Sequence, residues 1–597
     1  MSITERLSAF RARMEQENMA VVIVPTADAH ASEYIAEHFK TRQWLCGFTG
    51  SAGTLVVGRE EAALFTDGRY FIQAERQLAG SGVTLMRMGT PGVPTLEAYV
   101  AQLARPGESC GVDFSVVSAH FAADLSDTLA GKEIALRDTG DWFDELWADR
   151  PPMPQEKVFL LDERYAGMSV GDKLSAIRKV MAASGAKLHV CNVLDDIAWT
   201  LNVRGGDVLN TPVVMSYLLV GEENAFWFVD QGKVGEDVAA ALTGAGVLLR
   251  DYDEIERALD TVEEGTGVMV DGRKLTARLC AALADANIIQ HENPAFRLKA
   301  VKNDVELDNL RKAHVRDGRA VTRLMYWLKQ NAGKVEMTEQ SVSDTLLELR
   351  QAQPHFISPS FDTICAYREN AAMMHYKATE DSCAVIENRD LLLIDSGAQY
   401  LEGTTDITRT FAMGEVEKTQ KEHFTAVLCG MLNLQNARFL HGCTGIGLDI
   451  LARGPMWDLG IDYRCGTGHG VGYLLSVHEG PNAFRWYKSP TRNEDTVLEA
   501  GMVTTDEPGI YIEGSHGIRL ENELVCKKLE CGEYGQFMGF EAITCAPIDL
   551  DAVLPEQMTA RQRGWLNAYH AFVREQLTGL MANDDERAWL AHATRAI

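Results

Sequence analysis

The chain has 597 residues, with 57 Lys and Arg against 85 Asp and Glu and a formal net charge of −28 at pH 7. This acidic balance argues against broad binding to nucleic acid or to anionic membranes, because both require clustered Lys and Arg. No apolar run approaches a membrane span, and the charged N-terminal segment shows no secretory signal. The 12 Cys residues form no CxxC pair. We therefore expect a cytoplasmic protein with reduced thiols and several buried cores.

The predicted elements at the start of the chain alternate between helix and strand. Residues 3–17 carry apolar side chains at helical spacing, and residues 21–25 form an apolar run that ends at a proline. Two further short apolar runs, at 54–57 and 62–65, favour strands. This alternation is typical of an α/β domain. A cluster of prolines at 151–154 marks its predicted end.

A second unit of similar size follows the prolines. Its predicted helix, around 171–184, precedes an apolar strand at 188–190. Trp44 and Trp199 each precede a glycine-containing loop and then an apolar strand. This internal echo favours a duplication of the first unit, with similar α/β composition in unrelated units as the alternative.

Around residue 300 the pattern changes to a long helix. Asn303 and Glu306 have the spacing of a capping box, and the residues that follow are apolar at helical spacing. Beyond about residue 540 the sequence becomes helical again. We therefore predict four segments along the chain: 1–150, 151–300, 301–540 and a helical extension at 541–597.

The segment from 391 to 411 predicts a hairpin that carries two acidic residues. Residues 391–394 form a short apolar strand that ends at Asp395, and a turn follows at Glu402-Gly403. Residues 404–411 then alternate with period two and include Asp406. A hairpin of these strands would bring the two aspartates together. Burying either carboxylate without a partner would cost several kcal/mol.

Three more candidate side chains follow in glycine-rich or alternating segments. His469 lies between glycines at 466–472, a segment without the Lys-Ser or Lys-Thr ending of a phosphate-binding loop. Glu507 is placed at a strand end before a Pro-Gly turn, and Glu521 shares one face of a later strand with Arg519. We expect Arg519 to orient a ligand carboxylate, with a plain structural ion pair as the alternative.

These side chains form a candidate set for two metal ions: Asp395, Asp406, His469, Glu507 and Glu521. Their four carboxylates carry a charge of −4, which two divalent cations would balance in a dry site. One imidazole among oxygen ligands favours Mn²⁺, Co²⁺ or Fe²⁺ over a thiolate-type zinc site. Two metals that share carboxylates would lie roughly 3.5–4 Å apart and could hold a bridging hydroxide.

The five sequence contexts together resemble those of the pita-bread metallopeptidases, the fold of methionine aminopeptidase, prolidase, aminopeptidase P and creatinase. Motifs elsewhere in the chain narrow the resemblance to aminopeptidase P (Xaa-Pro aminopeptidase) in its long, three-domain cytosolic form. These motifs lie at 28–35, 50–54, 66–71, 202–208, 299–303 and 565–570. The resemblance therefore covers nearly the whole chain.

The resemblance implies an α/β (α+β) protein in which two creatinase-type N-terminal domains precede a C-terminal pita-bread domain. It matches the five candidate residues to the ligands of a dinuclear metal site, with Mn²⁺ expected and Co²⁺, Fe²⁺ or Zn²⁺ as alternatives. It also implies that His375 and His478 bind the substrate or stabilise its transition state. The family commonly has another histidine where this chain has Cys465. We expect an inert buried thiol there.

We therefore predict a metallo-aminopeptidase that hydrolyses the bond between an N-terminal residue and a penultimate proline in short peptides. The bond before proline is a tertiary amide without an N–H, and attack by a metal-bridging hydroxide does not need that group. Glu507 would act as the general base. The family leads us to expect a homodimer. A prolidase that cleaves Xaa-Pro dipeptides is the enzymatic alternative, and a catalytically silent binding module is the remote one. His30 is expected to pack rather than to touch substrate.

Overall fold

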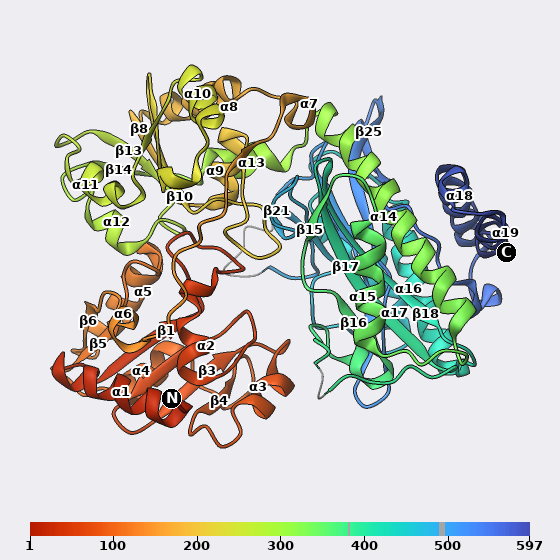
Figure 1. Cartoon of the computed structure of the whole chain (residues 1–597), viewed down its shortest axis with the longest axis horizontal. Helices are drawn as coiled ribbons and strands as arrows, with labels where there is room; N and C mark the ends of the chain where they lie inside the picture. The colour runs from red at the N-terminus through yellow and green to blue at the C-terminus, as the bar shows by residue number, and fades with distance from the viewer. Residues whose placement is uncertain (380–381, 489–495) are drawn as a thin grey trace. The chain divides into compact units, whose positions relative to one another are not determined.

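The computed structural model describes residues 1–379, 382–488 and 496–597 (Figure 1). The chain divides into two compact units. The first comprises residues 1–160 and 168–295, and the second comprises residues 161–167 and 296–597. None of the helices within the described ranges is long and apolar enough to cross a membrane.

The first unit begins with a six-stranded sheet flanked by helices. Helix α1 (Ile3–Gln16) starts at a capping box between Ser2 and Glu5 and buries its apolar stripe in the core beside the sheet. The predicted strands are confirmed as β1 (Val21–Pro25), β2 (Thr54–Gly58) and β3 (Ala62–Thr66). The sheet order is β4-β3-β2-β1-β5-β6, completed by β4 (Thr84–Arg87), β5 (Ser109–Val112) and β6 (Ala135–Asp138). Helices α2 (Thr41–Cys46), α3 (Phe71–Gln77), α4 (Leu96–Leu103) and α5 (Ala119–Ala130) complete this repeat.

The same unit contains a second sheet of the same topology. Its order is β12-β11-β10-β8-β13-β14. In both sheets the first strand along the chain pairs antiparallel with its neighbour on one side and parallel on the other. Helices α8 (Val170–Ser184) and α9 (Leu194–Leu201) occupy the places of α1 and α2 in the chain order. The strands are β8 (Leu188–Cys191), β10 (Ser216–Gly221), β11 (Ala225–Val229), β12 (Val247–Arg250), β13 (Gly267–Val270) and β14 (Asn287–Gln290). The internal echo is therefore confirmed at the level of the fold, although the predicted domain boundaries stay predictions.

The conformation of His30 agrees with a packing role. Its side chain is fully buried, with Nδ1 2.8 Å from the carbonyl oxygen of Asn192 and Nε2 2.8 Å from the hydroxyl of Tyr252. Both ring nitrogens therefore have protein partners. The imidazole joins the first repeat to the second within the first unit.

The second unit is built around the long helix α14 (Asp304–Asn331), whose capping box of Asn303 and Glu306 is confirmed. In Figure 1, α14 lies beside the strands β17 (Leu391–Tyr400) and β18 (Gly403–Ala412). Together with α15 (Glu339–Gln351), it buries one face of this hairpin in a core that includes Leu324, Leu346, Ile394 and Phe411. The sheet also contains β15 (Phe356–Pro359) and β16 (Ile364–Tyr367).

A six-stranded sheet of order β19-β26-β25-β22-β20-β21 forms the other half of this unit. Its strands are β19 (Arg438–Leu440), β20 (Gly468–Gly470), β21 (Glu479–Phe484), β22 (Val503–Asp506), β25 (Asn522–Gly532) and β26 (Gly535–Ala542). Helices α16 (Lys418–Gln435) and α17 (Gly445–Asp458) and the small hairpin of β23 (Gly509–Ile512) and β24 (His516–Arg519) complete it. The helical C-terminal segment is confirmed as α18 (Ala560–Leu577) and α19 (Asp584–Ala593).

The structure corrects the predicted length of one strand. We expected the first strand of the hairpin to end at Asp395, but β17 continues to Tyr400. Its last residues are polar yet fully paired with β18 and buried, and the side chain of Gln399 donates to the carbonyl of Leu475. These tertiary hydrogen bonds satisfy polar groups that read as a loop in the sequence.

A second correction concerns the segment around Glu521. Residues 517–522 alternate like one strand, but the chain leaves β24 after Arg519 and enters β25 at Asn522. The break occurs because β24 pairs with β23 whereas β25 pairs with β22 in the larger sheet. Glu521 therefore lies on the crossing between two sheets.

Candidate metal centre

The hairpin of β17 and β18 brings the two predicted aspartates to one face. Asp395 pairs with Thr408 and Gly397 pairs with Asp406, so the two aspartates are diagonal neighbours. Residues two positions apart along a strand share a face, and both carboxylates therefore lie on the side away from the α14 core. Both aspartates are buried. The predicted approach of Asp395 to Asp406 is confirmed.

His469 lies at the centre of β20, and the backbone fixes one of its ring nitrogens. Nδ1 is 2.9 Å from the carbonyl oxygen of Gly470, and because a carbonyl only accepts hydrogen bonds, the proton belongs on Nδ1. Nε2 then presents its lone pair 3.5 Å from Asp406 Oδ2 and 3.3 Å from Glu507 Oε1. A histidine whose other ring nitrogen donates to a carbonyl is the usual form of a metal ligand.

The glycines on either side of His469 are required by close backbone contacts. A Cβ at Gly468 would lie 1.8 Å from the carbonyl oxygen of Thr505, and one at Gly470 would lie 2.3 Å from that of Glu479. Any side chain would collide there, so only glycine lets β20 approach its neighbours this closely. The close approach brings His469 to the acidic side chains.

The two glutamates reach the same place from the larger sheet. Glu507 directly follows β22, and the hydroxyl of Thr505 donates to its Oε1 at 3.1 Å. Glu521 is fully buried, and its Oε2 accepts from the hydroxyl of Thr408 at 2.8 Å. Its backbone N–H also donates to the carbonyl of Thr408, which ties the crossing segment to β18.

The charges and open oxygens of this cluster suit divalent cations. Asp406, His469 and Glu521 each offer one ligand atom within 4.8 Å of the other two. Among the described residues, Asp395 Oδ1 and Glu521 Oε1 are buried without a hydrogen-bond partner. Burial, together with neighbouring carboxylates, raises the pKa of Asp406 and that of Glu521 well above their usual range. Cations would remove this repulsion and satisfy the open oxygens.

Arg519 contacts one carboxylate of the cluster, that of Asp395. Its Nη2 donates to Asp395 Oδ2 at 2.5 Å, and its Nε donates to the hydroxyl of Thr408 at 3.2 Å. Its Nη1 donates to the hydroxyl of Tyr511 at 2.7 Å. The sequence pointed to Arg519 but not to Tyr511, which lies on the neighbouring strand β23. The geometry supports the expected orienting role.

Comparisons with known proteins agree with this site. Residues 308–528 match metallopeptidase family M24, and residues 536–597 match the C-terminal region of peptidase M24. Residues 6–146 and 149–306 each match a creatinase/prolidase N-terminal domain. Aminopeptidase P2 of Arabidopsis thaliana is 38% identical over 636 residues, which cover 100% of this chain and 89% of the relative. The chain belongs to the aminopeptidase P family. A probable Xaa-Pro aminopeptidase P of Tuber melanosporum is also 38% identical, over 100% of this chain and 99% of the relative.

Solved structures place the fold in the same aminopeptidase P family. The X-prolyl aminopeptidase of Caenorhabditis elegans, described as a cytosolic enzyme with a di-nuclear active site, has a TM-score of 0.94 and 31% identity over 100% of both chains. An Xaa-Pro dipeptidase of Bacillus anthracis has a TM-score of 0.51 and 26% identity and covers 64% of this chain and 99% of that chain. The predicted fold class is confirmed.

The resemblance to the aminopeptidase P family assigns substrate-binding or transition-state roles to His375 and His478. The surroundings of these two histidines differ. The ring of His478 packs edge-on against His469, with ring centroids 4.3 Å apart. Its neighbour Glu479 is buried and accepts from Lys299 at 2.8 Å and from Lys302. This double ion pair anchors the backbone next to His478. His375 lies half-buried beyond the short helix at 368–372, and its role stays a prediction.

Cys465 occupies a partly buried position beside the same cluster. Burial and the charge of Glu507 raise the pKa of its thiol to about 12, so the thiol stays protonated at neutral pH. Its carbonyl oxygen accepts from Arg453, which also donates to the carbonyl of Tyr463 and pairs with Asp449. The segment before His469 is therefore held by α17, and a protonated thiol agrees with the expected inert role.

Proposed function

We propose that this chain is a dinuclear metal-dependent aminopeptidase that hydrolyses the bond between an N-terminal residue and a penultimate proline in short peptides. The observation that carries the proposal is the buried group of carboxylates around the lone pair of His469. This group lies in a fold that matches the nematode X-prolyl aminopeptidase over its whole length. The sequence relatives named Xaa-Pro aminopeptidase P support the same activity.

The proposed metal ligands are the five residues that the sequence singled out: Asp395, Asp406, His469, Glu507 and Glu521. Two divalent cations held by them would supply Lewis acidity at the scissile carbonyl and lower the pKa of an attacking water. We propose Mn²⁺ because oxygen donors dominate the set, with Co²⁺, Fe²⁺ or Zn²⁺ as alternatives.

The remaining steps belong to side chains of this chain. Glu507 is only partly buried, and Thr505 fixes its Oε1, so it is placed to accept the proton of the attacking water and to pass it to the departing proline nitrogen. The nitrogen needs this proton because it leaves as an amine and not as an anion. His478, beside His469, would donate a hydrogen bond to the developing oxyanion, and His375 is proposed for the same task.

We also propose a cytoplasmic homodimer. The nematode structure is described as that of a cytosolic enzyme, and the cysteines of this chain are all free thiols, mostly buried, as expected for a reducing compartment. The homodimer rests on resemblance to the family. Sedimentation of the purified chain tests the oligomeric state directly.

A comparison of two substrates tests the proposed reaction. The enzyme is stripped with a chelator, Mn²⁺ is added back, and an Xaa-Pro-Yaa tripeptide and an Xaa-Pro dipeptide are analysed in parallel. Release of the first amino acid from the tripeptide, restored by Mn²⁺, is the expected result. Cleavage of the dipeptide alone would make the chain a prolidase, the activity named for the Bacillus anthracis structure. Bound metal without cleavage of either peptide would favour a catalytically silent binding module.

A further inference from the structure

The backbone of Asp406 lies on a buried edge of its sheet. In the described sheets, strand β18 pairs only with β17, so the N–H groups on its other side need partners from outside the ladder. The N–H of Asp406 donates to Oε1 of Glu523 at 2.7 Å. Glu523 belongs to β25 of the larger sheet, and the hydrogen bond therefore joins the two sheets at a proposed metal ligand.

A carboxylate in the place of Glu523 needs polar partners. The side chain is fully buried, and a buried ionised group is costly unless it is paired. Nε2 of His314 lies 3.0 Å from Glu523 Oε1, and His314 is itself buried on α14. Nδ1 of His314 is 2.9 Å from the carbonyl oxygen of Leu310 and must donate to it. The carboxylate of Glu523 therefore lies between the backbone N–H of Asp406 and the ring of His314.

We propose that Glu523 and His314 form a positioning pair that fixes Asp406 for metal binding. The pair holds the backbone of Asp406 because Glu523 accepts its N–H and the ring of His314 lies against the same carboxylate oxygen. It acts through a backbone N–H and not through the metal, which makes both members positioning residues. The proposal rests on the proposed function, because it takes Asp406 to be a metal ligand.

Three variants separate positioning from general stability. Glu523→Ala removes the acceptor for the Asp406 N–H, whereas Glu523→Gln keeps an oxygen in the same place. His314→Gln removes the imidazole that lies against the carboxylate of Glu523. His570→Gln is a matched control, because His570 is equally buried and its Nε2 accepts a backbone N–H from Ile548, on α18 and away from the proposed ligands.

The measurement is calorimetric titration of the metal-free protein with Mn²⁺ alone. Losing an outer partner of a metal ligand typically weakens binding by about 10- to 100-fold. We expect that loss for Glu523→Ala and about tenfold for His314→Gln, with Glu523→Gln within a few-fold of wild type. His570→Gln should lower the melting temperature without changing Mn²⁺ affinity. At saturating Mn²⁺ the variants should recover kcat with an unchanged KM for the tripeptide.

The outcomes distinguish this inference from the proposed function. Wild-type Mn²⁺ affinity in both Glu523→Ala and His314→Gln would overturn the positioning role, even if the wild-type enzyme cleaves peptides. If Glu523→Ala fails to fold, the comparison of His314→Gln with His570→Gln decides, and equal Mn²⁺ affinity in those two variants overturns the role. Mn²⁺ binding by the wild type without cleavage of any peptide would instead refute the proposed function and leave the positioning result standing.

Discussion

Two clusters of side chains in the molecule have similar spacing but differ in how their charge is balanced. In each, one histidine and two acidic residues present ligand atoms within 4.8 Å of one another: Asp406, His469 and Glu521 in the second unit, and His38, Asp141 and Asp144 in the first. In each, Nδ1 of the histidine lies within hydrogen-bond distance of a backbone carbonyl. The carbonyl belongs to Gly470 at 2.9 Å in one place and to Pro151 at 2.8 Å in the other.

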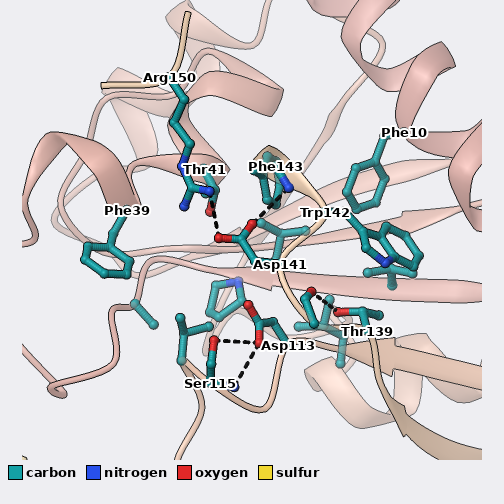
Figure 2. A pocket seen from close by; sticks show the side chains of 17 residues that line it. Phe10, Phe39, Thr41, Asp113, Ser115, Thr139, Asp141, Trp142, Phe143 and Arg150 are labelled. Atoms are coloured by element: carbon teal, nitrogen blue, oxygen red, sulfur yellow. Dashed lines mark hydrogen bonds and ion pairs between the residues drawn. The ribbon is translucent and has the colours of Figure 1, made fainter. Parts of the chain in front are cut away.

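The difference lies in what already balances the charge. Figure 2 shows Arg150 reaching Asp141, and its Nη1 lies 2.7 Å from Asp141 and 2.6 Å from Asp144. The side chain of Asp144 is 72% exposed, so water solvates it as well. At the candidate metal centre, Asp395 is the one carboxylate among the described residues that Arg519 is shown to pair with, and Glu521 is 1% exposed. Spacing alone therefore does not indicate a metal site, whereas buried carboxylates with few cationic partners favour one.

The cavity beside Arg150 supports the same conclusion. It lies where β1, β5 and β6 end, between Trp142, Phe143 and Asp113 (Figure 2). Its volume of about 50 Å³ accommodates only a few water molecules. Asp113 already accepts from the N–H and the hydroxyl of Ser115. This part of the first unit is a packed structural region.

The largest expected effect tests the metal centre itself. Asp406→Ala removes a ligand from the centre of the cluster, and we expect loss of nearly all activity and of tight Mn²⁺ binding. The fold should persist, because the variant also removes a source of repulsion among the buried acids. Activity assays in metal-saturated buffer, with circular dichroism as the control for folding, check this. Near wild-type activity would remove Asp406 from the ligand set.

His478→Ala should have the next largest effect. Loss of one donor to an oxyanion typically lowers kcat by about 10²- to 10³-fold. Because His478 packs on His469 and does not belong to the ligand set, Mn²⁺ affinity should change little. Steady-state kinetics at saturating Mn²⁺ provide the test. An unchanged kcat would assign His478 a structural role.

Much of the metal centre could be predicted from the sequence because its signals are local. Period-two alternation placed Asp406 opposite the apolar face of β18, and glycines on both sides marked His469. His314 and Glu523 could not be found in this way. Glu523 and Asp406 are 117 positions apart, and their contact exists only because the edge strand β18 of one sheet lies against the interior strand β25 of the other. An acid two residues after Glu521 is too common a pattern to indicate such a contact.

The difference between local sequence patterns and contacts that are distant in the sequence also explains the two corrected strands. The first strand was predicted too short because the polar groups after Asp395 find partners only in the tertiary structure, such as the hydrogen bond between Tyr400 and Asp317. The break at Glu521 likewise depends on which sheet each neighbouring strand joins. Local patterns predict an element, but partners distant in the sequence decide where it ends.

The pH dependence of stability offers a smaller effect, which arises from the buried carboxylates of the candidate metal centre. In the metal-free protein, burial and neighbouring carboxylates raise the pKa of Asp406 and of Glu521 above their usual values of 3.8 and 4.5. The folded state then holds protons that the unfolded chain has lost. The free energy of unfolding should therefore fall as pH rises from about 4 through these raised pKa values. Thermal melting of metal-free wild type and Asp406→Asn checks this, since the variant should show a shallower slope. Equal slopes would contradict the assigned cause.

The smallest expected effect concerns the cluster that Arg150 already neutralises. Arg150→Gln keeps a hydrogen-bond donor but removes the charge that balances Asp141 and Asp144, so a third and weaker Mn²⁺ binding event should appear in calorimetry, with Kd of about 1 mM. Adding His38→Ala should abolish that event, because it removes the imidazole of the cluster. The tight binding events and kcat should match wild type in both variants. If Arg150→Gln shows no third event, solvation of the exposed Asp144 is sufficient to keep this cluster free of metal. Burial would then outweigh the missing cation as the property that distinguishes the metal centre.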